Sequence, residues 1–572
     1  MRKIFALFLV LALLLALVGC KGETEEGGST LDSSFSSTRE EMFTKADMLT
    51  EPDISTAVTV TLNGSGADAS GGGVKINGSS VTVTDGGVYI LTGTLTGGTV
   101  VVDAGDNDKP RIILSGVNIA SANTAAIYVK NADKVFLFLH EGTENTLSSA
   151  GAFTAVDGEN VDAAIYSKSD LSVGGNGTLT VTSLFGHGIV SKDDLVIAGG
   201  SISVTAASHA LSANDSIRIC DTVLELTSGK DGIQAEHSED TSLGFVYIAG
   251  GNISVCAEGD GISASSYVEI ESGEITVTSG GGSKNSAKTH SDSYGRYPGA
   301  SFGSSHSDTD STSTKGIKAE HSILIEGGNF NINSADDAIH ANNSVIISGG
   351  TFKISTGDDA VHADEKLEIS GGTLDIQESY EGLEAMHVTV SGGSVSIVAE
   401  DDGINASGGN DGSGMGGRAP GGDMFGGGSS SSGSITISGG TVYINASGDG
   451  IDANGSLTIT GGHTTVCGPT TGDTAVLDYD KEATISGGTF IGTGSYMMAQ
   501  SFSSGSQGVI AVSVGTRVAG TKITLTDSLG NVIVSESPAL PYAIVILSSP
   551  DVVKGEEYMI TVGDTSGTFA AQ

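Results

Sequence analysis

The sequence contains no tryptophan and little proline, cysteine or positive charge. Of its 572 residues only 8 are proline and 4 are cysteine, and 26 basic residues face 68 acidic ones, for a net charge of −42. So few cysteines exclude a disulfide scaffold, and Cys220, Cys256 and Cys467 lie in strand-like runs that predict buried thiols. The charge excludes nucleic acid as a partner, because a phosphate backbone would be repelled. The absence of tryptophan excludes a tryptophan platform for sugar stacking.

The chain begins with a targeting segment. Two basic residues precede an apolar run over residues 4–18 that is too short for a membrane-spanning helix and is typical of a signal peptide. The run ends in LVGC at Cys20, which resembles a bacterial lipobox, in which the signal is cut before a cysteine that is then lipidated. We expect a signal peptide over 1–19, a lipid on Cys20, and a polar tether with a short N-terminal segment over 20–56. These features predict a protein anchored on the extracellular face of a bacterial membrane.

Glycine is abundant, with 86 residues, and it punctuates a repeat of about 22 residues. Gly-Gly pairs begin at Gly327, Gly349, Gly371 and Gly392, between short runs rich in β-branched residues. Each copy, such as IEGGNFNINSADDAIHA, has short strand-like runs separated by turns that need the positive φ angles of glycine. A period in this range is typical of a solenoid, but the pattern of a leucine-rich repeat is absent and the unit is too short for a propeller blade. Three short strands per repeat therefore predict the coils of a parallel β-helix.

The repeat predicts an all-β protein with one long repetitive region. We expect the parallel β-helix, with about 22 residues per coil, to extend over residues 57–508. Two low-complexity insertions, at 279–313 and 407–432, interrupt the period and are expected to be loops. Over residues 509–572 the period gives way to longer alternating strands, which predict a small C-terminal antiparallel β-domain or a cap.

Aligning the copies brings polar residues into two columns beside the third strand of each coil. The candidate metal ligands lie at the corner before this strand or within it, and they are Asp336, Asp337, Asp358, Asp359, Asp401, Asp402, Asp449 and Asp452. Neighbouring side chains of a strand alternate faces, so the candidate ligand-binding residues point outward, and they are Lys318, His340, His362, Glu384 and Asn405. Carboxylates stacked about 5 Å apart repel one another, and hard oxygen ligands at this spacing suit Ca²⁺. We therefore predict Ca²⁺ as the cofactor.

Two other interpretations of these columns stay open. The aspartates could cap backbone amides at the corners of the coils, which is a common role of aspartate in turns. This role would explain an aspartate at each corner, but it does not easily explain doublets on three of four consecutive coils. His340 and His362 could instead hold a transition metal, although they lack the usual ligand spacing.

At these residues the sequence resembles the clostridial extracellular carbohydrate-binding β-helix lipoproteins, which are related in fold to pectate lyases. The resemblance covers the GG…DD-(A/G)-I-x-A repeat, the insertion rich in Gly, Met, Arg and Pro, and the tail LSSPDVVKGEEYMITVG. It implies a right-handed parallel β-helix, bound Ca²⁺, and binding of cellulose and acidic sugars such as polygalacturonate. Ca²⁺ held by aspartate pairs would bridge to the carboxylates of a polyuronate, which a bare acidic face would repel.

Three functions are compatible with these features. We expect a cell-surface lipoprotein that binds plant cell-wall polysaccharide through calcium and is not an enzyme. The second function is a calcium-dependent polysaccharide lyase, which needs a lysine or arginine base near the metal. The candidate bases are Lys318, Lys353 and Lys366, of which Lys318 is best placed in the outward column. The third function is a structural adhesin without a sugar ligand.

Overall fold

The computed structural model describes residues 37–156, 158–286, 313–407, 433–470 and 474–572. The predicted signal peptide, Cys20, the tether up to residue 36 and most of both predicted insertions lie outside the described residues. All described elements belong to the compact unit Thr38–Gln572. They are almost entirely β-strands, as predicted, together with the short helix α1 (Arg39–Met42) and the 3-10 turn η2 (Ser283–Asn285). Among the helices of the described residues, none has the length and apolar character needed to cross a membrane.

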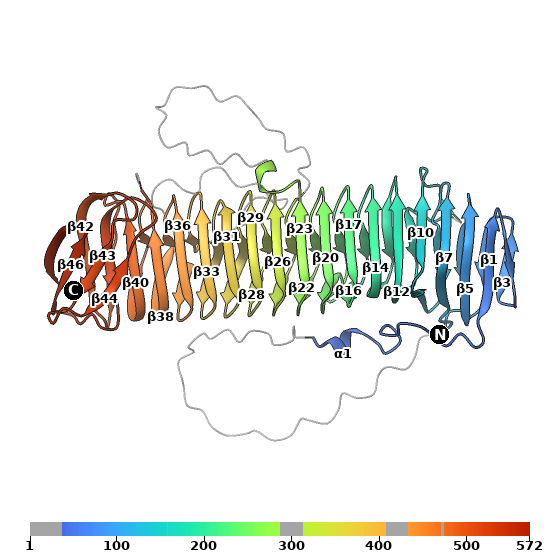
Figure 1. The fold of residues 1–572 in the computed structure, drawn as a ribbon, viewed down its shortest axis with the longest axis horizontal. Helices are drawn as coiled ribbons and strands as arrows, with labels where there is room; N and C mark the ends of the chain where they lie inside the picture. The colour runs from blue at the N-terminus through green and yellow to red at the C-terminus, as the bar shows by residue number, and fades with distance from the viewer. Residues whose placement is uncertain (1–36, 157, 287–312, 408–432, 471–473) are drawn as a thin grey trace, which may run out of the picture. The chain divides into compact units, whose positions relative to one another are not determined.

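Most strands belong to one large sheet in which parallel pairing dominates. In its most regular part each strand pairs with the strand three positions further along the chain, which gives three parallel ladders. Figure 1 shows the strands of one ladder side by side. We call one passage of the chain through the three ladders a coil. The first ladder contains β17 (Val223–Ser228), β20 (Asn252–Ala257), β23 (Glu274–Ser279), β26 (Asn329–Ser334), β29 (Thr351–Thr356), β31 (Thr373–Ser379), β33 (Ser394–Ala399) and β36 (Thr441–Ala446).

The other two ladders follow the same coils. The second ladder contains β13 (His187–Ser191), β15 (Leu211–Ala213), β18 (Ile233–Ala235), β21 (Ile262–Ala264), β24 (Ile317–Ala319), β27 (Ile339–Ala341), β34 (Ile404–Asn405), β37 (Ile451–Ala453) and β39 (Leu477–Tyr479). The third contains β16 (Ser216–Cys220), β19 (Phe245–Ile248), β22 (Tyr267–Ile270), β25 (Ser322–Ile325), β28 (Ser344–Ile347) and β35 (Gly433–Ile437). Two strands, β30 (Val361–Ile369) and β32 (Leu383–Val390), run through both of these ladders. Longer strands join the third ladder to the first, and they are β12 (Asp170–Ser183), β14 (Asp194–Ala206), β38 (Gly455–Cys467) and β40 (Glu482–Gly494).

The apolar core runs between the ladders. Alternate residues of each strand face it, as in β26, where Phe330 and Ile332 are buried between exposed neighbours. Equivalent residues stack from coil to coil, and the rings of Phe330 and Phe352 lie 4.4 Å apart between centroids. A single coil cannot bury its apolar edges alone, so the fold is stabilised by contacts between neighbouring coils. Burial contributes about 25 cal/mol for each Å² of apolar surface removed from water.

The Gly-Gly pairs form corners between the third and first ladders, as predicted. The second glycine of successive pairs has a left-handed conformation, with φ of 108° at Gly328, 97° at Gly350 and 84° at Gly372. The first glycine allows the next coil to approach closely. A Cβ on Gly349 would lie 2.2 Å from the carbonyl oxygen of Glu326 on the preceding coil. Both positions therefore need glycine, for different reasons.

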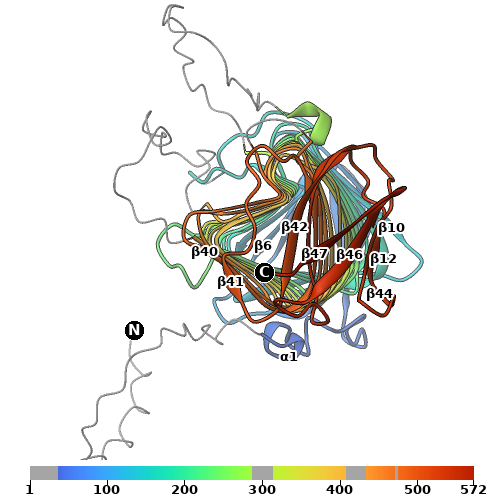
Figure 2. The ribbon, with the colours of Figure 1, turned by 90° about the vertical axis from the view of Figure 1, so that its left-hand side faces the viewer.

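Antiparallel strands make the large sheet mixed. Near residue 58 the pairs are β1 (Val58–Gly64) with β2 (Ala67–Ala69), and β3 (Val74–Asn77) with β4 (Ser80–Val83). After the repeat, β45 (Tyr542–Ser548) pairs antiparallel with β40 and β42 (Val509–Arg517). A separate antiparallel sheet follows, with the order β44 (Val532–Glu536), β43 (Ile523–Thr526), β46 (Glu557–Val562) and β47 (Thr565–Ala570). Its strands β44, β46 and β47 are in front in Figure 2.

The three described cysteines have different environments. Cys220 and Cys467 are buried, as predicted, and Cys220 packs in a small cluster with Phe43, which follows α1, and with Tyr247. Cys256 is exposed, so the prediction of a buried thiol was wrong there. The reason is the alternation of β20, in which Cys256 faces outward between two buried neighbours.

Candidate functional site

A titratable side chain occupies the same corner of successive coils, two residues before the apolar residue that begins most second-ladder strands. We call this set the corner column. Its members are His187, His209, Asp231, Asp260, Lys315, Asp337, Asp359, Glu381, Asp402 and Asp449. Backbone hydrogen bonds align them, because the amide that follows each member donates to the carbonyl of the member on the next coil, as from Gly316 to Asp337. The sequence analysis identified four aspartates of this column as metal ligands and did not identify Lys315 or the two histidines.

Several corner aspartates cap the amide of the next coil. The backbone N–H of Asp359 donates to Oδ1 of Asp337 at 3.1 Å, and that of Glu381 donates to Oδ1 of Asp359 at 3.3 Å. The N–H of Asp449 likewise donates to Oδ1 of Asp402 at 2.6 Å. The alternative interpretation, in which aspartates turn corners, therefore describes a real role for one oxygen of each carboxylate. The second oxygen is left for other contacts.

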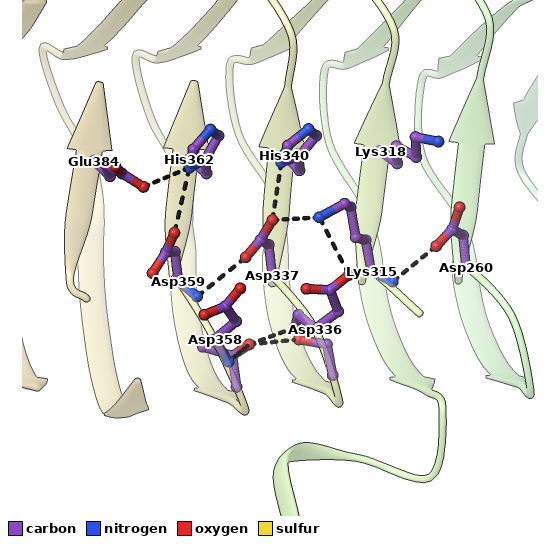
Figure 3. A network of polar contacts seen from close by, with 12 residues as sticks. Asp260, Lys315, Lys318, Asp336, Asp337, His340, Asp358, Asp359, His362 and Glu384 are labelled. Carbon is purple, nitrogen blue, oxygen red and sulfur yellow. Dashed lines mark hydrogen bonds and ion pairs between the residues drawn. The ribbon is translucent and has the colours of Figure 1, made fainter. Parts of the chain in front are cut away.

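The outward column has the predicted register. Lys318, His340, His362, Glu384 and Asn405 pair in turn on neighbouring strands. Figure 3 shows the first four of them side by side above the corner column. The side chains point away from the apolar core, but His340 is only 4% exposed and His362 only 1%. Their rings stack on each other, with centroids 4.8 Å apart, so they do not offer the open ligand-binding surface that we expected.

The carboxylates gather in three clusters along the corner column, the first of which is Asp336, Asp337 and Asp358. Nζ of Lys315 contacts Oδ2 of Asp337 and lies 3.3 Å from Oδ2 of Asp336 (Figure 3). Nδ1 of His340 lies 2.9 Å from the same oxygen of Asp337. The Lys315 side chain is only 2% exposed. An ammonium group from the chain itself thus provides the positive charge in this cluster, which makes it a poor fit for a divalent metal ion.

The second cluster joins Asp359, His362 and Glu384. Nδ1 of His362 lies 2.7 Å from Oε2 of Glu384 and 3.3 Å from Oδ2 of Asp359, and Nε2 lies 3.2 Å from Oδ1 of Asp364. Burial opposes protonation, but these three hydrogen bonds raise the pKa of His362 well above its ordinary value. A charged imidazolium therefore satisfies the carboxylates, and Ca²⁺, which takes oxygen ligands, does not fit in its place.

The third cluster, of Asp402, Asp449 and Asp452, contains oxygen donors only. Burial and the neighbouring carboxylates raise the pKa of Asp402 to about 9. The pKa of Asp449 rises to about 7, and that of Asp452 rises to about 6, in both cases chiefly through burial. Within the described part of the chain none of the three forms an ion pair, and Asp401 adds further negative charge beside them. This cluster thus offers three carboxylates with no lysine or histidine among them, which are ligands of the hard oxygen kind.

The three candidate lyase bases lie in different environments. Nζ of Lys318 lies 2.8 Å from Oε1 of Glu320. Burial lowers the pKa of Lys318, but Asp260 and Glu320 raise it by more. The amine therefore stays protonated at neutral pH. Lys353 is exposed on β29 in the first ladder, and Lys366 pairs with Glu368 in the third-ladder part of β30. Neither belongs to the outward column.

These observations define a class of protein: an almost entirely β-stranded chain that carries a column of stacked carboxylates. A family model described as carbohydrate-binding domain-containing protein matches residues 77–360 and 343–382, together more than half of the chain. The chain belongs to this family.

Two known proteins are similar to parts of this chain. A carbohydrate-binding domain-containing protein of Acetivibrio thermocellus is 39% identical over 122 residues, which are 21% of this chain and 43% of that protein. The match thus spans less than half the length of that relative. A solved structure of a polysaccharide lyase-like protein from C. thermocellum, a gadolinium derivative, has 33% sequence identity and a TM-score of 0.38, and covers 40% of this chain and 92% of the other.

Proposed function

We propose that this protein binds an acidic plant cell-wall glycan through Ca²⁺ held by Asp402, Asp449 and Asp452. Membership of the carbohydrate-binding family supports a polysaccharide as the partner. The observation that carries the proposal is the third cluster, in which three oxygen donors lie within 4.8 Å of one another. Their pKa values are raised because each carboxylate is buried beside others. A divalent cation would relieve this repulsion.

The chemistry of the cluster explains how an acidic chain could bind an acidic sugar. Ca²⁺ prefers about 6–8 oxygen ligands, so three aspartates leave positions for water and for a sugar carboxylate. The chain itself holds the carboxylates in place: Asp402 Oδ1 accepts the amide of Asp449, and Nδ2 of Asn454 donates to Oδ2 of Asp452 at 3.3 Å. Polygalacturonate is the model ligand, and cellulose is the neutral alternative.

The proposal includes a scaffold and a location. The scaffold is a right-handed parallel β-helix over residues 57–508, with residues 509–572 as a C-terminal antiparallel β-domain; the parallel ladders support it. The location is the extracellular face of a bacterial membrane, with a lipid on Cys20, which the LVGC sequence supports. In this arrangement the protein would hold glycan at the cell surface.

Titration calorimetry with oligogalacturonate tests the proposal. We expect binding in the presence of Ca²⁺ that disappears with a chelator. The double variant Asp402→Asn/Asp449→Asn should lose at least about tenfold in affinity, or about 1.4 kcal/mol. Asp375→Asn, at an exposed position of β31, is the matched control and should bind like the wild type.

Three results would count against the proposal. Equal binding of oligogalacturonate with and without the chelator would show that binding does not need calcium. An unchanged affinity of the double variant would show that Asp402 and Asp449 do not hold the metal. Release of unsaturated sugar ends from polygalacturonate would show a lyase rather than a binding protein.

A further inference from the structure

A groove of about 680 Å³ lies on the second ladder, several coils before the third cluster. Its floor is formed by Gln234 of β18, Ser263 of β21 and Lys318 of β24, which pair in register on three successive strands. Glu236 and Glu320, which follow Gln234 and Lys318 by two residues, also line the groove. The volume is within the range of about 300–1,000 Å³ that is typical of small-molecule sites.

The groove presents paired hydrogen-bond donors and acceptors. Nε2 of Gln234 donates to Oε2 of Glu236 at 3.0 Å, and Nζ of Lys318 lies 2.8 Å from Oε1 of Glu320. The side chain of Lys318 is 22% exposed and that of Glu320 is 46% exposed, so both can also contact a ligand. Burial raises the pKa of Glu320, but Lys318 and Asn342 lower it by more. The carboxylate therefore stays a hydrogen-bond acceptor. Ser263 lies on the strand between those of Gln234 and Lys318.

The charges of the lining select the class of ligand. Besides Glu236 and Glu320, the carboxylates of Asp231 and Asp260 line the groove, and only two lysines, Lys230 and Lys318, oppose them. This excess of negative charge disfavours a sugar carboxylate, while the ammonium of Lys318 disfavours a bare cation. A neutral hydroxyl group can both donate and accept a hydrogen bond. A ligand rich in hydroxyl groups can therefore satisfy amide, ammonium and carboxylate groups at once.

We propose that this groove is a second glycan site, which binds a neutral sugar chain without metal. The inference rests on the proposed function for the ligand being a glycan, but it assigns different residues and a different sugar. Neighbouring strands lie about 4.8 Å apart, so the floor residues offer contacts to successive parts of an extended chain. Calcium plays no part, because the ammonium of Lys318 already supplies the positive charge in the groove.

The test uses the full chain and neutral hexasaccharides of β-1,4-linked glucose, xylose and mannose, titrated with Ca²⁺ and with a chelator. We expect at least one hexasaccharide to bind equally well under both conditions. Ser263→Tyr should fill the groove and weaken binding by about tenfold or more, and Lys318→Met should weaken it as well. The matched control is Ser254→Tyr, an exposed position of β20 in the first ladder. Thermal unfolding of each variant checks that it folds.

The results separate this site from the calcium site. The Asp402→Asn/Asp449→Asn variant should keep its affinity for the neutral sugar and lose its affinity for oligogalacturonate. The inference fails if none of the hexasaccharides binds, if their binding needs Ca²⁺, or if Ser263→Tyr and Ser254→Tyr bind alike. Calcium-dependent binding of oligogalacturonate by the wild type in the same series would then still uphold the proposed function. If the wild type binds a neutral hexasaccharide but not oligogalacturonate, the proposed function is overturned and the inference about the groove is upheld.

Discussion

The side-chain ammonium of Lys315 lies against the carboxylate of Asp337 on the following coil, inside the protein. The two residues occupy equivalent positions, because Gly316 after the lysine bonds to the backbone of Asp337. A lysine therefore stands where the following coils have an acidic residue. It separates Asp260 from Asp337 in the corner column, and it supplies a positive charge to the first of the three carboxylate clusters.

Replacement of Lys315 should destabilise the protein strongly. Lys315→Met keeps much of the side-chain length but leaves buried carboxylates without their cation, which typically costs about 3–5 kcal/mol. Urea unfolding at pH 7 measures the free energy of unfolding. The control Lys353→Met removes an exposed lysine of β29 and should change it by less than about 0.5 kcal/mol. Equal effects of the two substitutions would show that the buried pair does not matter for stability.

Acid should weaken the fold through His187. Burial and the nearby His209 lower the pKa of His187 to about 4, and the two rings stack 5.1 Å apart. Between about pH 6.5 and pH 4 the unfolded chain therefore binds a proton that the folded chain does not, so stability falls as the pH falls. At one pKa unit per about 1.4 kcal/mol, this loss is at most about 3 kcal/mol.

Thermal unfolding between pH 4 and pH 7 tests this acid sensitivity. His187→Gln should flatten the pH dependence, since the substituted side chain does not titrate. His387→Gln, at an exposed position of β32, should leave it as in the wild type. A His187→Gln protein with the same acid profile as the wild type would assign the sensitivity to other groups.

A methyl group at the first glycine of a corner should disturb the stacking of two coils. In Gly349→Ala the new Cβ would meet the backbone carbonyl of Glu326 at 2.2 Å, so the coils must move apart. We expect a loss of about 1–3 kcal/mol, as for other overpacked sites, measured from urea unfolding midpoints. Gly72→Ala is the control, because nothing lies within 4 Å of its Cβ. A similar loss in both proteins would contradict this account of the corner.

The register of the coils could be predicted from the sequence, and His340 lies beside His362 as the aligned copies indicate. The prediction succeeds because the pattern has only one solution. A slip of one residue would turn Ile339 and its equivalents out of the core. The glycine corners add a second constraint at the same spacing, so the period alone was enough to place the side chains on their faces.

The burial of the outward column could not be predicted in the same way. Alternation along a strand specifies the direction of a side chain, but what covers it comes from other coils. His362 is covered by the ring of His340 and by the carboxylates of Asp359 and Glu384. The groove at Ser263 escaped prediction for the same reason, since its depth depends on the sizes of side chains on several coils.

Lys315 was missed because it directly follows an insertion, where the repeat is hardest to align. The letters TKGIKA do align with DDAIHA, which places Lys315 opposite Asp337. This comparison would have identified the lysine as a member of the column. Its contact with Asp337 still depends on the reach of the side chain, which only the structure gives.

The corner bonds give the stack a direction. His209 accepts the amide of Asp231, Asp231 accepts that of Asp260, and Asp260 accepts that of Lys315, so each of these three coils fixes the corner of the coil that follows. A duplicated copy of the Asp231 or Asp260 repeat would meet an acceptor on the coil before it and would offer an acceptor to the coil after it. Such a copy would form no new kind of contact at this corner, so the number of these coils is a quantity that gene duplication could adjust one repeat at a time.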